Sequence, residues 1–290
     1  MATSPAHYIG EQIGFLIEEV TVDFISAAIS DGEFYVDHRH SRGARRGAKE
    51  VTMEDAQGNK HKLDIVIERG GSEERFGRPV AFIEVAWRRY EKHSKNKVQE
   101  ISGAILPVVK RFHDSQPFQG AVLAGVFSNN SVRQLESEGF SVVFISYDTI
   151  CSAFRDAVGL EIQWEENTSS ILLEGIASKI RRMTDHDKAN FKRFLRAREA
   201  VAFSQFIEAL RRVLNRRVVS VSVTPLHGKV NTCSAIEDAV RFIQDYDESS
   251  VGSMPLIKYR IFIQYNTGDS VELNFCDKGS AVRALNHYSL

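Results

Sequence analysis

Apolar residues recur at helical spacing in two segments of the N-terminal half, residues 8–30 and 94–111. The first stripe comprises Ile9, Ile13, Leu16, Val20, Phe24, Ala27 and Ala28, and the second comprises Val98, Ile101, Ile105, Val108 and Val109. Side chains spaced three and four residues apart lie on one face of a helix. The pattern therefore predicts two long amphipathic helices, the second beginning at Ser94.

Strand patterns occupy two segments: the one between the two predicted helices, and the one that follows the second helix. Residues 50–55, 62–68 and 79–88 are predicted as three successive strands, with Gly70 and Gly71 closing the second. Two nearly continuous apolar runs, 120–127 and 141–146, flank a short helix at 131–138. This order predicts a mixed sheet with an antiparallel meander and a parallel βαβ half, in an α/β/α sandwich.

A polar stretch at 161–170 suggests a boundary between a first domain, residues 1–163, and a second part, residues 164–290. The second part begins with a helical arm that extends to about Asn215. A small α+β module follows, with the order β-α-β-β-α, and Asn266 to Asp269 form the hairpin turn of its last two strands. We expect these C-terminal elements to serve target recognition or dimerisation.

The composition is that of a folded protein, with 43% hydrophobic and 26% charged residues. Three cysteines far apart in the sequence indicate neither a disulfide framework nor a zinc site. The N-terminus does not resemble a signal peptide, and no apolar run has the length of a membrane span, so we expect a cytoplasmic protein without membrane contact. The motifs of P-loop NTPases, α/β-hydrolases and dinucleotide-binding proteins are absent from the sequence.

Two acidic residues interrupt the apolar pattern of neighbouring predicted strands, Asp64 in 62–68 and Glu84 in 79–88. A charge in the middle of a strand is costly without a partner. Carboxylates on adjacent strands can converge on one point, and Mg²⁺ takes one or two carboxylates together with water and phosphate. The alternative is a pair of strand charges neutralised by Arg88 or Lys62, with no metal.

The order of helix, meander containing Asp64, strand ending in Phe82-Ile83-Glu84-Val85-Ala86, and helix resembles the core of the PD-(D/E)XK nuclease superfamily, which includes many restriction endonucleases. The resemblance covers the first domain and implies a restriction-endonuclease-like α/β/α sandwich. It implies Asp64 and Glu84 as metal ligands and Mg²⁺ as the cofactor. It also implies a supporting acidic catalytic residue on the first helix, best matched by Glu18.

One position departs from the family pattern: Ala86 stands where the family has its lysine. Alanine can neither orient a water molecule nor stabilise negative charge. Some members of the superfamily are thought to supply this cation from the next helix, where Lys97 is our first choice and Lys95 the second. Both lysines lie beside the apolar stripe of that helix, so periodicity does not separate them.

Two basic segments are candidates for contact with phosphates. The loop 38–49 contains Arg42, Arg45 and Arg46, and the end of the third strand is followed by Arg88, Arg89 and Lys92. Each segment could instead be a solvated surface. A third basic stretch, which extends from Lys179 through Arg217, is at least as consistent with solvated helix faces.

Together these features predict a Mg²⁺-dependent endodeoxyribonuclease that hydrolyses phosphodiester bonds of double-stranded DNA, of the restriction or phage-defence kind. Cleavage of both strands needs two active sites, so a homodimer is expected. The alternative, favoured by Ala86, is a nuclease-fold protein without catalysis that binds nucleic acid. A third possibility is an interaction protein whose C-terminal module is the working part.

Overall fold

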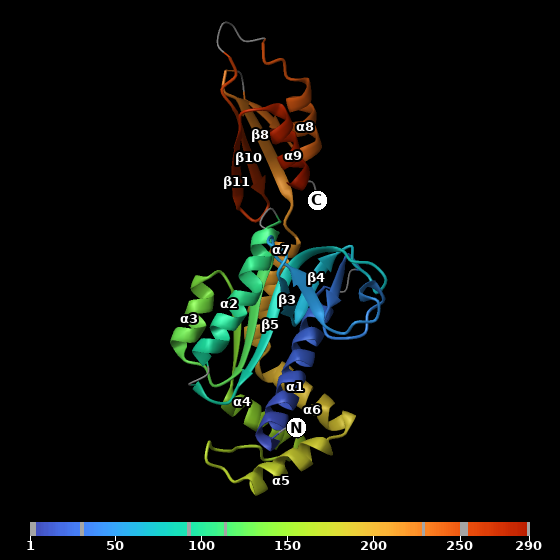
Figure 1. The fold of residues 1–290 in the computed structure, drawn as a ribbon, viewed down its shortest axis with the longest axis vertical. Coiled ribbons are helices and arrows are strands. Elements are labelled where there is room, and N and C mark those ends of the chain that lie inside the picture. Colours follow the sequence, from blue (N-terminus) through green and yellow to red (C-terminus); the bar gives the residue numbers. More distant parts are fainter. Residues whose placement is uncertain are drawn as a thin grey trace. The chain divides into compact units, whose positions relative to one another are not determined.

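A mixed five-stranded sheet is at the centre of the N-terminal part of the chain in the computed structural model (Figure 1). The structure describes residues 4–29, 32–91, 94–112, 115–227, 230–249 and 255–288. The sheet consists of β1 (Phe34–Asp37), β4 (Ile65–Arg69), β5 (Arg78–Arg88), β6 (Phe118–Gly125) and β7 (Ser141–Ser146), in the order β1-β4-β5-β6-β7. The first three strands are antiparallel, and β5, β6 and β7 are parallel. These observations confirm the α/β class and the mixed sheet.

A separate hairpin, β2 (Val51–Glu54) with β3 (Lys60–Leu63), precedes β4. The sequence predicts one strand over 62–68, but the structure divides this segment at Asp64. On one side of Asp64 the chain pairs only with β2, and on the other side it pairs with β1 and β5. Asp64 therefore lies where the chain leaves one sheet and enters another. Its backbone is not part of the strand pairing of either sheet.

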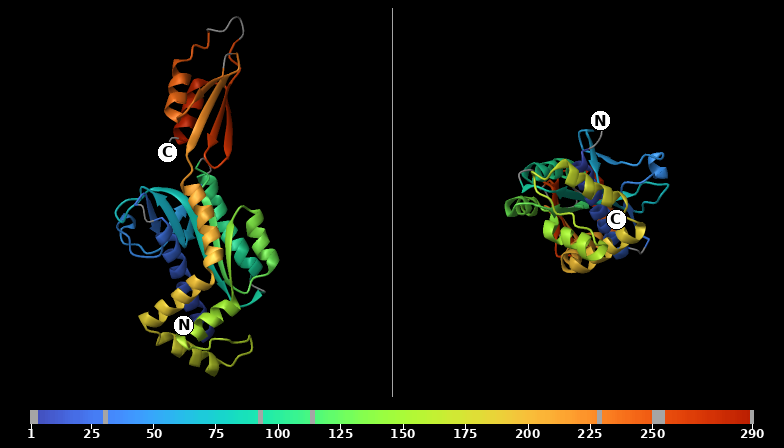
Figure 2. Two further views of the ribbon diagram at one scale, coloured as in Figure 1. Left: turned by 180° about the vertical axis from the view of Figure 1, so that it is seen from behind. Right: turned by 90° about the horizontal axis from the view of Figure 1, so that it is seen from below.

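Two long helices lie on opposite faces of the main sheet, α1 (Pro5–Ala28) and α2 (Ser94–Arg111). Gly10 of α1 lies against Trp87, while Ala86 packs in the core beneath α2. Neighbouring residues of a strand point to opposite faces, so the two helices sandwich β5. Two shorter helices, α3 (Asn129–Ser137) and α4 (Tyr147–Ser152), pack against β7 and, for α4, also against β6 (Figure 2).

Three helices follow a π-helical turn at Ala153–Val158: α5 (Ser170–Arg181), α6 (Asp185–Arg198) and α7 (Ala200–Leu214). Helices α5 and α6 pack along α1. The chain separates into compact units at Arg211/Arg212, so α5, α6 and most of α7 belong to the N-terminal unit, whereas the sequence places its boundary at 163/164. Aromatic pairs join them to it: Phe24 stacks on Phe203 with ring centroids 4.1 Å apart, and Phe154 lies 4.6 Å from Phe191.

The C-terminal unit, Arg212–Leu290, contains its own four-stranded antiparallel sheet. Its elements are β8 (Val218–Pro225), β9 (Asn231–Cys233), α8 (Ile236–Asp245), β10 (Tyr259–Tyr265), β11 (Ser270–Phe275) and α9 (Lys278–Tyr288), and the sheet order is β11-β10-β8-β9. The short strand β9 was not expected, so the order is β-β-α-β-β-α. Strand β10 alternates buried and exposed residues, as a sheet does when helices cover one face.

Among the described residues, no helix combines the length and the apolar character that crossing a bilayer requires. The three cysteines are free, with Cys151 and Cys233 buried and Cys276 exposed.

Candidate active site

Asp64 and Glu84 contact each other at the point where β4 begins. The backbone N–H of Asp64 donates to Glu84 Oε1 at 3.3 Å, and the backbone N–H of Val85 donates to Asp64 Oδ2 at 2.8 Å. Ile65 pairs with Ile83 in the ladder, so the bend at Asp64 places its side chain beside the next residues of β5. The two strands therefore bring together the two carboxylates that the sequence singles out.

Burial makes this carboxylate pair electrostatically costly. Glu84 is 6% exposed, and this burial raises the pKa of Glu84 well above its usual value. The negative charge of Asp64 raises the pKa of Glu84 further, and the positive charge of Lys97 lowers it. Two carboxyl groups in this position need a proton or a cation between them to be stable.

Glu18 of α1 lies in the electrostatic field of the same site. Its side chain is half-buried, and this burial raises the pKa of Glu18 to about 7. The second cause of the rise in pKa is the negative charge of Asp64, and Arg39 acts in the opposite direction. Acidic groups from α1, from the bend before β4 and from β5 therefore interact, although the sequence places them far apart.

The donor set fits a hard divalent cation. Asp64 and Glu84 supply two oxygen-donor side chains, and Mg²⁺ is commonly held by one or two carboxylates while water and phosphate complete its shell. The described residues contain no cluster of three or more His, Cys, Asp and Glu side chains gathered as a metal site. A cation here would therefore have two carboxylate ligands, and Glu18 would act through the field or through water.

Of the two lysine candidates, Lys97 lies within electrostatic reach of Glu84. Lys97 lies in the first turns of α2, its side chain is 20% exposed, and its charge lowers the pKa of Glu84. Its ammonium is 3.5 Å from Glu100 Oε2. Lys95 is exposed. Lys97 also lines a cavity of about 450 Å³ together with Gly10 and Ala86.

The basic loop is more ordered than its sequence suggests, because two of its arginines are buried. Arg42 is fully buried and donates to Asp37 at 2.6 Å and to Glu68 at 2.9 Å. Its remaining N–H groups donate to backbone carbonyl oxygens, so no donor is left for a phosphate. Arg45, with 7% of its side chain exposed, binds Asp37 as well, whereas Arg46 is exposed in a left-handed conformation.

The arginines after β5 also differ from each other. Arg88 has a third of its side chain exposed and lies 3.5 Å from Glu100 Oε2. Arg89 is packed over the Tyr147 ring at 4.0 Å and donates to the carbonyl oxygen of Trp164. Arg88 thus remains accessible to a phosphate. Arg89 instead binds the segment before α5 through the carbonyl oxygen of Trp164. Lys92 lies outside the described residues.

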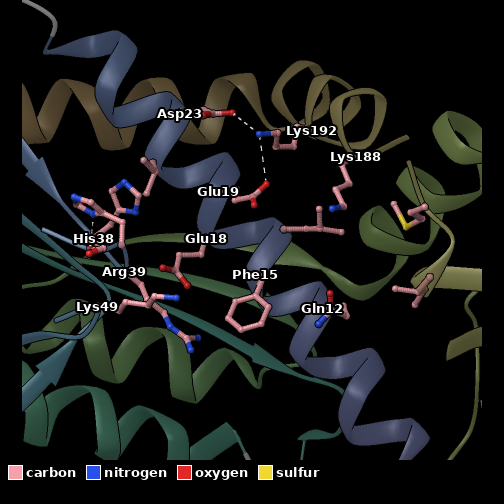
Figure 3. Close-up of a pocket in the computed structure, with 16 residues that line it drawn as sticks. Gln12, Phe15, Glu18, Glu19, Asp23, His38, Arg39, Lys49, Lys188 and Lys192 are labelled. Carbon is pink, nitrogen blue, oxygen red and sulfur yellow. Dashed lines mark hydrogen bonds and ion pairs between the residues drawn. The ribbon is translucent and has the colours of Figure 1, made fainter. Parts of the chain in front are cut away.

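A cavity of about 740 Å³ adjoins Glu18, and sequence reasoning did not single it out (Figure 3). It is lined by α1, by the segment after β1, and by residues of α5 and α6. Arg39 and Lys49, both within the predicted basic loop, face it, as do Phe15 and Lys188. The basic composition of the loop 38–49 could have indicated Arg39 and Lys49. No local sequence pattern indicates that α5 and α6 pack along α1.

Comparisons with known proteins assign no family. No family model matches the sequence, and no curated protein matches it. The chain is similar to a solved structure described as the crystal structure of a protein of unknown function, AF1548, with 10% identity. The match covers 69% of this chain and 94% of that chain, with a TM-score of 0.28, which is too low to support an argument about either fold or function.

Proposed function

We propose that this protein is a Mg²⁺-dependent DNA endonuclease, of the restriction or phage-defence kind, with a core like that of the PD-(D/E)XK nucleases. The observation that carries the proposal is the contact between Asp64, at the bend before β4, and Glu84 of β5, which is buried and has a raised pKa. Perturbed carboxyl pairs of this kind cluster at functional sites. The helices on both faces of the mixed sheet support a restriction-endonuclease-like α/β/α sandwich.

Each residue then has a definite role. Asp64 and Glu84 hold the cation, which when bound stabilises the extra negative charge of the phosphate. Lys97 hydrogen-bonds the attacking water and keeps it in line with the phosphorus. The water oxygen forms a new P–O bond, the bond to the leaving oxygen breaks, and the leaving oxygen takes up a proton. Lys97 in this way supplies the cation that Ala86 cannot.

Glu18 completes the acidic side of the site. With a pKa near 7, it exists in both protonation states at neutral pH. A carboxyl group of this kind can accept a proton from water near the scissile phosphate. Arg46 and Arg88 are exposed enough to contact phosphates of double-stranded DNA, and a homodimer would cleave both strands.

A second candidate function is binding of nucleic acid without cleavage. Ala86 favours it, since this residue is 1% exposed and packs beneath α2, so the position of the family's lysine is occupied by a core side chain. The two candidates differ in what happens to bound DNA. An endonuclease converts it to fragments when Mg²⁺ is added, and a binding protein leaves it intact.

The test is incubation of the purified protein with unmethylated plasmid and phage DNA and Mg²⁺. Wild type is compared with Asp64→Ala and Lys97→Ala, and Lys95→Ala is the matched control on the same helix turn. We expect discrete fragments from wild type and Lys95→Ala, and intact DNA from the other two. DNA that stays intact with wild type but shifts on a native gel would support the binding protein instead.

A further inference from the structure

The cavity beside Glu18 has the size and the walls of a binding site for a small organic group. Its volume is about 740 Å³, within the range of ligand pockets, roughly 300–1,000 Å³. Leu16 and Val22 of α1 and Ile180 and Met183 at the end of α5 supply an apolar lining. Figure 3 shows Phe15 and Glu18 projecting from the same helix, one turn apart. A group in the cavity would therefore be close to the carboxylates of the proposed active site.

A planar cationic surface lies on this wall. The guanidinium of Arg39 lies over the Phe15 ring, 5.2 Å from the ring centroid. Arg39 also pairs with Glu50 at 3.4 Å, and about half of each side chain is exposed, so this contact is easily exchanged. Aromatic rings and arginine planes are the surfaces on which unstacked bases lie in proteins that bind single-stranded nucleic acid.

Cations stand at the rim of the same cavity. The ammonium of Lys49 has no ion-pair or hydrogen-bond partner among the described residues. Lys188 is 3.6 Å from Asp185, whose side chain is fully exposed, so the pair is weak. Either lysine can bind a phosphate oxygen with little loss of free energy from the contacts that it gives up.

The acidic residues of the cavity are already neutralised in part. Lys192 of α6 lies 3.5 Å from Glu19 and 3.2 Å from Asp23, and Figure 3 shows these contacts between α1 and Lys192. One of their two negative charges is therefore balanced before a ligand enters. The lining carries four basic side chains, Arg39, Lys49, Lys188 and Lys192, against the three carboxyl groups of Glu18, Glu19 and Asp23. The excess of positive charge suits a ligand with a flat base and an anionic phosphate.

We propose that this cavity receives one unstacked nucleotide of the DNA strand, with its base against Phe15 and Arg39 and its phosphate at Lys49 or Lys188. The proposal rests on the proposed function only in taking DNA as the polymer bound. It adds that the protein requires a nucleotide that has left the base stack, either in a single strand or displaced from a duplex. A regular duplex keeps its bases stacked inside and cannot fill the cavity.

The test separates base stacking from phosphate contact. Binding is measured by fluorescence anisotropy, without Mg²⁺, for a labelled 15-nucleotide strand of mixed sequence and for a strand of the same length made of abasic residues. Phe15→Leu removes the ring but keeps an apolar helix-forming side chain, and Lys49→Met removes the charge. We expect Phe15→Leu to weaken binding of the mixed strand by about 5- to 100-fold and to leave the abasic strand unchanged. Lys49→Met should weaken binding of the mixed strand and binding of the abasic strand by the same factor as each other.

Equal effects of Phe15→Leu on both strands, or no effect on either, would overturn the proposal. Thermal unfolding of each variant checks that the fold persists, and Ser26→Ala, at an exposed position of the same helix that does not line the cavity, is the control. Two duplexes, one regular and one with a two-nucleotide bulge, distinguish the source of the nucleotide. Tighter binding of the bulged duplex than of the regular one, with the difference lost in Phe15→Leu, assigns the site to a displaced nucleotide. Because binding is measured without Mg²⁺, failure of the cleavage assay and failure of this test are separate results.

Discussion

The backbone N–H of Asp64 donates to the side chain of Glu84, and the carboxylate of Asp64 accepts from the residue after Glu84. This reciprocal contact fixes both carboxylates through the backbone of the two strands. The position of the acidic pair is therefore set by the sheet itself. Under the proposed function, this support from the backbone would suit a pair of metal ligands.

Removing the charge of Glu84 should separate its structural effect from its role in cation binding. Burial and Asp64 favour the protonated form of Glu84, and glutamine resembles that form, so Glu84→Gln should change the free energy of unfolding by less than about 1 kcal/mol. Wild type should unfold at a higher temperature when Mg²⁺ is present, and the variant should lose this increase. Thermal unfolding with and without Mg²⁺ measures both effects.

Glu136→Gln is the control for that experiment, since Glu136 is an exposed residue of α3, a helix that packs against β7 and α2. It should respond to Mg²⁺ as wild type does. An unchanged Mg²⁺ response in Glu84→Gln would exclude Glu84 as a ligand.

The pKa of Glu18 predicts how stability changes with pH. The folded state raises this pKa from 4.5 to about 7, so the folded state binds the proton more tightly than the unfolded state. The resulting stabilisation is full below about pH 4.5 and is lost as the pH rises through about 7. In urea unfolding between pH 4.5 and 8, without Mg²⁺, Glu18→Gln should show a shallower decline than wild type.

The same measurement on Glu11→Gln provides the comparison, because Glu11 is an exposed residue on the same helix. Parallel pH profiles for wild type and Glu18→Gln would contradict the assigned burial of Glu18.

Arg42 should matter for folding and not for phosphate contact. Its guanidinium neutralises Asp37 and Glu68, so Arg42→Met leaves buried negative charge without a partner. Loss of one member of a buried ion pair costs roughly 3–5 kcal/mol. Arg46→Met, on the exposed part of the loop, should change stability by less than about 0.5 kcal/mol. Urea unfolding of the two variants gives the comparison, and similar stabilities would show that the buried cluster is not formed.

Glu100 should oppose DNA binding. Its carboxylate lies 3.5 Å from both Arg88 and Lys97, in a position that a phosphate oxygen can take. Exposed ion pairs contribute about 0–1 kcal/mol, so Glu100→Gln should tighten DNA binding by at most about fivefold. Anisotropy at several salt concentrations measures the change, and weaker binding by the variant would place the DNA elsewhere.

The sequence was sufficient for the elements whose signal is local. The stripes of α1 and α2 and the apolar runs of β6 and β7 predicted helices and strands that the structure contains. Asp64 and Glu84 were found because an ionisable residue inside an apolar strand needs a physical reason. Lys97 could not be preferred over Lys95 by periodicity, because only the packing of α2 decides which lysine lies near Glu84.

Features that depend on tertiary contacts were not predictable in this way. Arg42 and Arg45 were expected on a phosphate-facing loop. Their partner Asp37 is near them in sequence, but Glu68, the second partner of Arg42, comes from β4, which only the fold brings near. The polar segment before α5 has the composition of a linker, yet Phe191 and Phe203 attach the helices after it to the N-terminal unit. The composition of a segment describes that segment alone. It does not indicate which surface the helices after the segment pack on.

The measurement that tests the central claim most directly is the rate of DNA cleavage as a function of Mg²⁺ concentration for wild type, Asp64→Asn and Lys97→Met. We predict saturable, Mg²⁺-dependent cleavage by wild type and no detectable cleavage by Asp64→Asn. For Lys97→Met we predict a rate about 10²- to 10⁴-fold lower at saturating Mg²⁺. Cleavage by Asp64→Asn at the wild-type rate, or absence of cleavage by wild type on every DNA tested, would contradict the assignment of Asp64 and Glu84 as the catalytic metal site.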